Sequence, residues 1–243
     1  MKPDKIIAVR NNKTVYKDGD SCLKVFSRDF SKTDILNEAL NQARVEETGL
    51  NIPKIKSVTV IDGKWTIVSD YIRGKTLSRL MLEYPEKTDG YIKQLVDIQS
   101  EMHNKSCPML SRLRDKTIER LRLARLDPSV LKRLCALLDE IPEADNLCHG
   151  DFSPSNIVIS DNGAYILDWS HASRGNKALD TAVSYLLLYL DNTSDDAEIY
   201  LQMFCEKNGI DAGYIKKLLP VAAAAQLSKS NEKEREFFNS WIK

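Results

Sequence analysis

The segment CHGDFSPSNIVI, residues 148–159, constrains the fold more than any other part of the chain. It places Asp151 five positions before Asn156, and an apolar run follows. The turn sequence Asp161-Asn162-Gly163 then leads to a second apolar run that is closed by Asp168. Two short apolar runs around an Asn-Gly turn are typical of an antiparallel hairpin. We therefore expect a hairpin whose ends present three oxygen-bearing side chains to one cleft.

The order of these three side chains suits phosphoryl transfer from ATP. This reaction needs a carboxylate that orients the attacking hydroxyl group and two oxygen ligands that hold Mg²⁺ on the phosphates. The Asp-x-x-x-x-Asn spacing is that of a kinase catalytic loop, and Asp168 stands where the metal-binding Asp of a kinase would stand. The sequence predicts Asp151 as the catalytic base and Asn156 and Asp168 as ligands of Mg²⁺.

The stretch from His149-Gly150-Asp151 to Asn156, together with Leu167-Asp168-Trp169, resembles the aminoglycoside phosphotransferase and choline kinase family of small-molecule kinases. Protein kinases more often carry Arg in place of Gly150 and Phe in place of Trp169. The resemblance implies an α+β, protein-kinase-like fold of two lobes. The N-lobe is an antiparallel sheet plus one helix, and the C-lobe is mostly helical.

The resemblance also implies where the parts of such a fold begin and end. We expect the N-lobe at 1–70, the hinge at 71–74 and the helical C-lobe at 75–243. We expect the C-lobe to contain the catalytic loop 148–159 and the metal-binding segment 166–170. Outside these segments, Asp180 is expected either to cap a helix over 181–190 or to anchor the catalytic loop, and His149 to organise that loop.

The N-terminal region carries a second kinase signature. Strand and turn patterns alternate over 5–26, with turns at Asn11-Asn12-Lys13 and Asp18-Gly19-Asp20. Lys24 lies inside an apolar strand, and an amphipathic helix over 33–47 supplies Glu38 as its partner. A strand lysine paired with a helix glutamate is how kinases fix the phosphates of ATP. The alternative is that Lys24 faces solvent on an edge strand.

The remaining nucleotide contacts follow from the resemblance. We expect adenine to lie against the backbone of Asp70, Tyr71 and Ile72, and Val158 and Leu167 to complete the site. Tyr71 either lines the nucleotide or packs in the core between the lobes. The nucleotide is ATP or GTP. The chain has neither the G-x-G-x-x-G loop of protein kinases nor a Walker motif, so ordinary backbone must cover the phosphates.

Composition excludes several other classes. Lys plus Arg and Asp plus Glu both number 35, which argues against a nucleic-acid or anionic-membrane surface. Five scattered cysteines without a C-x-x-C motif indicate reduced thiols and a cytoplasmic protein. The N-terminus lacks the apolar run of a signal peptide, and no apolar stretch is long enough to span a bilayer. No feature of the sequence encodes the oligomeric state.

The resemblance implies that the acceptor is a small molecule such as an aminoglycoside, a choline-like amino alcohol or a sugar. The acidic segment 191–198 suits a cationic acceptor, but it better suits the N-terminus of a following helix. The basic segment 106–125 indicates a solvated helix face or, less often, an anion site. The alternatives to a small-molecule kinase are a nucleotide-binding regulatory module without catalysis and a protein kinase. The presence of Lys24, Asp151, Asn156 and Asp168 argues against the first.

Overall fold

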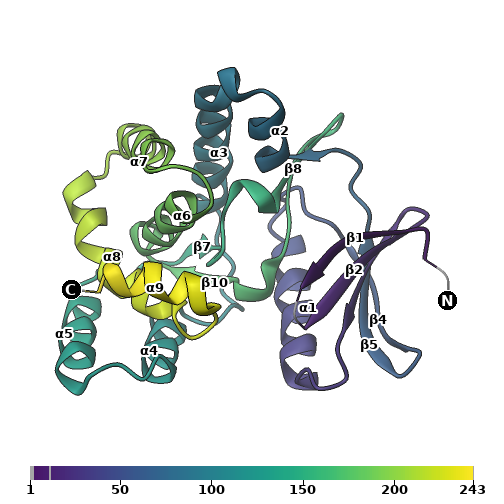
Figure 1. Ribbon diagram of the computed structural model, residues 1–243, viewed down its shortest axis with the longest axis horizontal. Helices are drawn as coiled ribbons and strands as arrows, with labels where there is room; N and C mark the ends of the chain where they lie inside the picture. Colours follow the sequence, from purple (N-terminus) through teal and green to yellow (C-terminus); the bar gives the residue numbers. More distant parts are fainter. Residues whose placement is uncertain (1–2, 11, 243) are drawn as a thin grey trace. The chain divides into compact units, whose positions relative to one another are not determined.

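The computed structural model describes residues 3–10 and 12–242 (Figure 1). The chain divides into two compact units. The first unit comprises Met1–Thr76 and Asn156–His171, and the second comprises Leu77–Ser155 and Ala172–Lys243. These compact units are defined by their internal packing, whereas the predicted lobes are defined by their function. The predicted N-lobe 1–70, hinge 71–74 and C-lobe 75–243 therefore stay a prediction.

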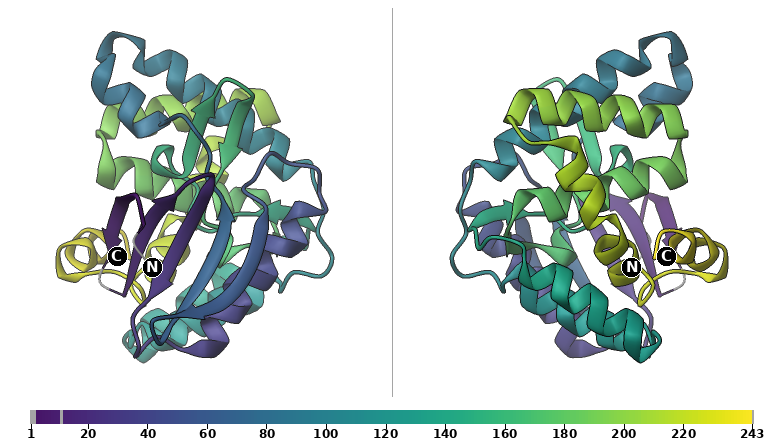
Figure 2. Two further views of the ribbon diagram at one scale, coloured as in Figure 1. Left: turned by 90° about the vertical axis from the view of Figure 1, so that its right-hand side faces the viewer. Right: turned by 90° about the vertical axis from the view of Figure 1, so that its left-hand side faces the viewer.

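A five-stranded antiparallel sheet forms most of the first unit, as predicted, with its strands side by side in Figure 2. The strand order is β1-β2-β3-β5-β4. Gly19 turns the chain between β2 and β3 at φ +56°, a backbone conformation that favours glycine. Of the predicted turn 11–13, Asn11 lies outside the described residues and Lys13 already belongs to β2. The strands are β1 (Lys5–Arg10), β2 (Lys13–Asp18), β3 (Ser21–Phe26), β4 (Ile55–Ile61) and β5 (Lys64–Asp70).

Helix α1 (Lys32–Glu46) packs on this sheet through an apolar face (Figure 1). Ser31 begins the helix, because its side chain accepts a hydrogen bond from the Asp34 N–H group. Ile35 is fully buried in a core cluster with Phe26 and Ile67. Burying such a side chain stabilises the fold by about 1.5–3 kcal/mol. This packing fixes α1 against β3, the strand that carries Lys24.

The predicted hairpin is present as β8 (Ile157–Ser160) and β9 (Gly163–Ile166), with a two-residue turn between Ser160 and Gly163. A short strand, β6 (Lys75–Thr76), extends it to three strands. Just before β6, a Cβ on Gly74 would lie 2.1 Å from the carbonyl oxygen of Ile159. The chain can therefore pass this close to β8 only with glycine at position 74.

The second unit is mostly helical, as predicted. Figure 2 shows its helices, and α9 lies beside α8. Its central helix, α6, is mostly buried and packs on α7 and α8. Two short antiparallel strands, β7 (Asn146–Cys148) and β10 (Ser173–Gly175), complete the unit. The helices are α2 (Leu77–Glu83), α3 (Thr88–His103), α4 (Leu113–Leu123), α5 (Pro128–Asp139), α6 (Lys177–Asp191), α7 (Ser194–Asn208), α8 (Ala212–Gln226) and α9 (Glu232–Ser240).

Helix α6 begins earlier than the predicted range 181–190. Helix α6 starts at Lys177, because the Asn176 side chain accepts a hydrogen bond from the Ala178 N–H group at 2.9 Å. Helix α7 starts at Ser194, because Thr193 caps it. Within the described residues, no helix combines the length and the apolar composition needed to cross a membrane.

Candidate active site

The first unit brings Lys24 and Glu38 together, as the sequence predicts. Lys24 on β3 donates to the carboxylate of Glu38 on α1, and its Nζ atom also lies 3.2 Å from Oδ1 of Asp168. The side chains of Lys24 and Glu38 are only 16% and 8% exposed. This burial rules out the alternative in which Lys24 faces solvent.

The charges of this cluster stabilise one another. Burial alone would lower the pKa of the Lys24 ammonium, but the carboxylates of Asp168 and Glu38 outweigh burial and raise that pKa above its ordinary value. Burial would raise the pKa of Asp168, but Lys24 and Lys13 hold it well below its ordinary value. Lys24 is therefore protonated and Asp168 ionised at neutral pH.

Lys13 is a member of the cluster that the sequence did not predict. Its Nζ atom lies 3.3 Å from Oδ2 of Asp168, so both oxygens of this carboxylate face an ammonium group. The sequence pattern predicts Lys13 in a polar turn. In the structure, Lys13 belongs to β2 and is paired with Phe26 on β3, so it lies in the sheet. Together with Glu38, the cluster holds two ammonium groups and two carboxylates.

Asn156 and Asp168 flank the two strands of the same hairpin. Asn156 directly precedes β8, Asp168 follows β9 by two positions, and the Leu167 N–H group donates to the Asn156 carbonyl oxygen at 2.8 Å. One carboxylate and one amide oxygen make a hard donor set, and Mg²⁺ in kinases takes few protein ligands and fills its other positions with water and phosphate. The residues present therefore fit this ion.

The Asp168 backbone is held in an unusual conformation. Its φ angle is +58°, in the left-handed region that residues other than glycine seldom adopt. Two contacts hold the segment after it: Asn41 on α1 donates to the Ser170 carbonyl oxygen at 3.3 Å, and the fully buried Trp169 donates to the Ile166 carbonyl oxygen at 3.1 Å. Asn41 is a second residue that no sequence motif indicates.

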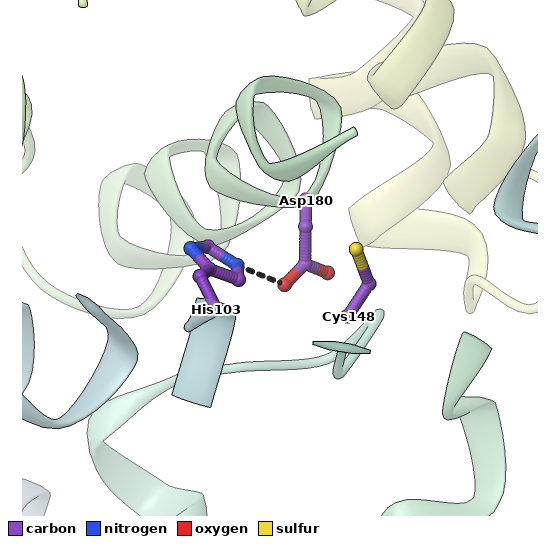
Figure 3. A group of neighbouring side chains, drawn as sticks. All are labelled: His103, Cys148 and Asp180. Carbon is purple, nitrogen blue, oxygen red and sulfur yellow. Dashed lines mark hydrogen bonds and ion pairs between the residues drawn. The ribbon is translucent and has the colours of Figure 1, made fainter. Parts of the chain in front are cut away.

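In the second unit, Asp180 anchors the loop that carries Asp151, and Figure 3 shows its bond to His103. Its carboxylate accepts hydrogen bonds from the Gly150 N–H group at 2.7 Å, the His149 N–H group at 3.1 Å and His103 Nε2 at 2.9 Å. This geometry decides between the two predicted roles: Asp180 anchors the loop, and Asn176 caps the helix.

His149 organises the same loop from within. It is fully buried, and its Nδ1 atom accepts a hydrogen bond from the Asp151 N–H group at 3.2 Å. Accepting at Nδ1 requires that this atom carry no proton. The Asp151 backbone is thus tied to His149, which is tied in turn to Asp180. The hydroxyl groups of Ser153 and Ser155 lie 2.9 Å apart and shape the next turn.

The buried trio of His103, Cys148 and Asp180 has the residue types of a metal site, but its chemistry points elsewhere (Figure 3). The Asp180 carboxylate is already used by three donors. Burial and the nearby Asp180 raise the pKa of the Cys148 thiol well above its ordinary value, whereas a metal ligand must be a thiolate. We interpret the trio as the structural support of the loop that carries Asp151.

The residues predicted to contact adenine lie at the end of β5. The N–H groups of Asp70 and Tyr71 donate to the carbonyl oxygens of Lys54 at 3.0 Å and Asp20 at 3.1 Å. Lys17 Nζ lies 5.5 Å from the centre of the Tyr71 ring. On the hairpin of the same unit, Val158 is buried and Leu167 is half-buried.

Pairing a strand lysine with a helix glutamate, above a hairpin that supplies an Asn and an Asp, is the arrangement of enzymes with the protein-kinase type of fold. The sequence agrees with this class. The model of the Phosphotransferase enzyme family matches residues 8–214, and the chain belongs to this family of enzymes. The predicted resemblance is thereby confirmed.

Solved structures confirm the fold. A thermostable mutant of aminoglycoside phosphotransferase APH(4)-Ia, in a ternary complex with AMP-PNP and hygromycin B, superposes with a TM-score of 0.71 at 15% identity, covering 98% of this chain and 89% of that chain. A choline/ethanolamine kinase family protein from Mesorhizobium loti gives 0.65 at 15% identity, covering 100% and 86%. Amicoumacin kinase hAmiN, in complex with AMP-PNP, Ca²⁺ and Ami, gives 0.66 at 12% identity, covering 100% and 88%. A search of curated proteins found no match.

Proposed function

We propose that the protein is a kinase that transfers the γ-phosphate of ATP to a hydroxyl group of a small molecule. The observation that carries this proposal is the buried cluster of Lys24, Glu38 and Asp168. Two carboxylates that hold an ammonium group inside a sheet give little net stability, because the cost of burying the charges offsets their attraction. Their arrangement is better explained by nucleotide binding.

In this proposal the first unit binds the nucleotide. Lys24, fixed by Glu38, contacts the α- and β-phosphates, and Asn156 and Asp168 hold Mg²⁺, which when bound neutralises charge on the triphosphate. Adenine lies against Asp70, Tyr71 and Ile72. Because the N–H groups of Asp70 and Tyr71 already donate within the unit, we assign the adenine hydrogen bond to the N–H group of Ile72.

Asp151 acts on the acceptor. Its carboxylate orients the acceptor hydroxyl and takes the proton as the oxygen attacks the γ-phosphorus. Proton transfer is late in such a loose transition state, so the position of the carboxylate matters more than its basicity. The hydrogen bonds that tie the Asp151 loop to His149 and Asp180 supply this position.

We infer the class of acceptor from the ligands and names of the similar structures. Hygromycin B and amicoumacin are bound by two of them, and a third is a choline/ethanolamine kinase family protein. We propose a hydroxyl-bearing antibiotic or amino alcohol as the acceptor. We also propose that the enzyme works in the cytoplasm, where ATP is abundant and where its five free cysteines stay reduced.

The test is a phosphoryl-transfer screen with ATP and Mg²⁺ over aminoglycosides, amicoumacin, choline, ethanolamine and sugars. We expect transfer to at least one acceptor, detected by mass spectrometry as a phosphorylated product. Asp151→Asn should abolish most of this transfer and leave ATP binding intact. If the wild-type chain transfers phosphate to none of these acceptors and also fails to bind Mg-ATP, the proposal is wrong.

A further inference from the structure

We propose that Lys229, in the turn between α8 and α9, is a positioning residue for Asp151. The inference rests on the proposed function, in which Asp151 is the catalytic base. Lys229 lies beyond residue 214, where the match to the family model ends, so the family assignment does not bear on it. Both residues belong to the second compact unit.

The inference rests on the Lys229 ammonium group, which bridges two oxygen atoms of the catalytic loop. Lys229 Nζ lies 3.4 Å from Oδ1 of Asp151 and 3.4 Å from the carbonyl oxygen of Gly150. One ammonium group thus contacts both the backbone and the side chain of the catalytic loop. The side chains of Lys229 and Asp151 are 26% and 34% exposed, so the pair is partly shielded from water.

The turn that carries Lys229 is well anchored. The Lys229 N–H group donates to the Gln226 carbonyl oxygen at 3.1 Å, and the Ser230 hydroxyl donates to the same oxygen at 2.7 Å. Directly afterwards, Asn231 and Glu234 form a capping box that begins α9. The backbone is therefore fixed on both sides of Lys229, which places its side chain beside the Asp151 loop.

The bridge has a defined task during phosphoryl transfer. The acceptor oxygen forms a bond to the γ-phosphorus, its proton passes to the Asp151 carboxylate, and the bond to the β,γ-bridging oxygen breaks, with its electron pair leaving on ADP. Before the proton moves, the carboxylate plane must be aimed at the hydroxyl group. His149 and Asp180 fix the backbone of this loop, and Lys229 fixes the side chain.

The contact also gives the C-terminal region a role in catalysis. Helix α9 packs on α8, and Arg235 of α9 donates to the Leu227 carbonyl oxygen at 2.7 Å, within the turn that precedes Lys229. The end of the chain thereby supports the position of a side chain that contacts the catalytic loop.

The test compares Lys229→Met and Lys229→Arg with a matched control, Lys217→Met. Lys217 lies on α8 and pairs with Glu140 at 2.7 Å, away from the catalytic loop. Activity is measured as γ-phosphate transfer from Mg-ATP to the best acceptor of the screen. Because a misplaced catalytic group costs up to about 100-fold, we expect Lys229→Met to lower kcat by about 10- to 100-fold. KM for ATP should stay within about twofold, Lys229→Arg should retain most of the activity, and Lys217→Met should match the wild type.

A double mutant separates positioning from a general structural effect. If Lys229 acts only through Asp151, adding Lys229→Met to Asp151→Asn should cost no further activity, because residues that act as a unit are non-additive. Independent, additive losses would overturn the inference, and so would a kcat of Lys229→Met equal to that of the wild type. If Lys229→Met does not fold, as judged by circular dichroism, the same comparison is made with Lys229→Gln.

The outcomes distinguish this inference from the proposed function. An active wild type with an equally active Lys229→Met variant would overturn the role of Lys229 and leave the kinase proposal standing. A wild type that neither binds Mg-ATP nor transfers phosphate would overturn both.

Discussion

At the scale of single residues, the cluster of Lys24, Glu38 and Asp168 depends on one buried cation. Among the described residues of the first unit, only Lys24 contacts both Glu38 and Asp168. Removing one member of a buried, charged set leaves its partners uncompensated, and this cost exceeds the net value of the intact set. The same ammonium serves the fold and, in our proposal, the phosphates of ATP.

Lys24→Met should therefore weaken both properties. We expect a loss of about 3 kcal/mol in the free energy of unfolding, measured in urea, because Glu38 stays buried without its cation. Calorimetry should show binding of Mg-ATP weakened by about tenfold or more, since an ion pair to phosphate is worth at least about 1.4 kcal/mol. Lys64→Met, at an exposed position of β5, is the control. Unchanged ATP affinity in Lys24→Met would contradict the assigned role.

Asp180 gives the second residue-scale prediction, a dependence of stability on pH. Burial would raise the pKa of Asp180, but its bonds from His103 and the Gly150 N–H group hold it below its ordinary value. A carboxyl group with a depressed folded-state pKa adds stability above its unfolded value of about 4, and this stability is lost as the pH falls through the folded-state pKa.

Asp180→Asn should remove this contribution. At pH 7 we expect the variant to unfold with about 2–4 kcal/mol less free energy than the wild type, because a buried acceptor of three bonds becomes an amide that can accept at only one atom. The difference should shrink as the pH is lowered below about 4, through the depressed folded-state pKa of Asp180. A difference that does not depend on pH would show that the charge of Asp180 contributes nothing.

At the scale of elements, the hairpin β8–β9 depends on a close approach that only glycine permits. The Asn-Gly turn signal and the two apolar runs were enough to predict the hairpin. The need for glycine at position 74 was not visible in sequence, because it arises from the chain passing beside the Ile159 carbonyl oxygen, which is remote in the sequence.

Two glycine substitutions should therefore change the free energy of unfolding in opposite directions. Gly74→Ala should lower the free energy of unfolding by about 2 kcal/mol or more, because its Cβ would meet backbone atoms that cannot move aside. Gly90→Ala lies in helix α3, where a Cβ meets no atom within 4 Å, and should raise it by about 0.5–1 kcal/mol. Chemical denaturation of both variants checks the pair. A Gly74→Ala variant as stable as the wild type would contradict the close approach.

At the scale of the whole molecule, the sequence was sufficient to predict the fold class and the family, whereas the roles of the site residues stay predictions. The fold class and the family could be predicted because Lys24, Asp151, Asn156 and Asp168 stand in motifs whose spacing is local and characteristic. The residues that sequence reasoning missed, Lys13, Asn41 and Lys229, have no such motif. Their contacts reach Asp168, Ser170 and Asp151 across large separations in the chain, and only the tertiary fold creates them.

The measurement that tests the central claim most directly is a calorimetric titration of the wild-type chain with ATP, with and without Mg²⁺, because it requires no knowledge of the acceptor. Asp168→Asn is the test variant, and Asp161→Asn, in the exposed turn of the same hairpin, is the matched control. We predict stoichiometric binding that is stronger with Mg²⁺ and is weakened by about tenfold or more in Asp168→Asn alone. Absence of ATP binding by the wild type, or equal affinity in Asp168→Asn and the wild type, would contradict the account.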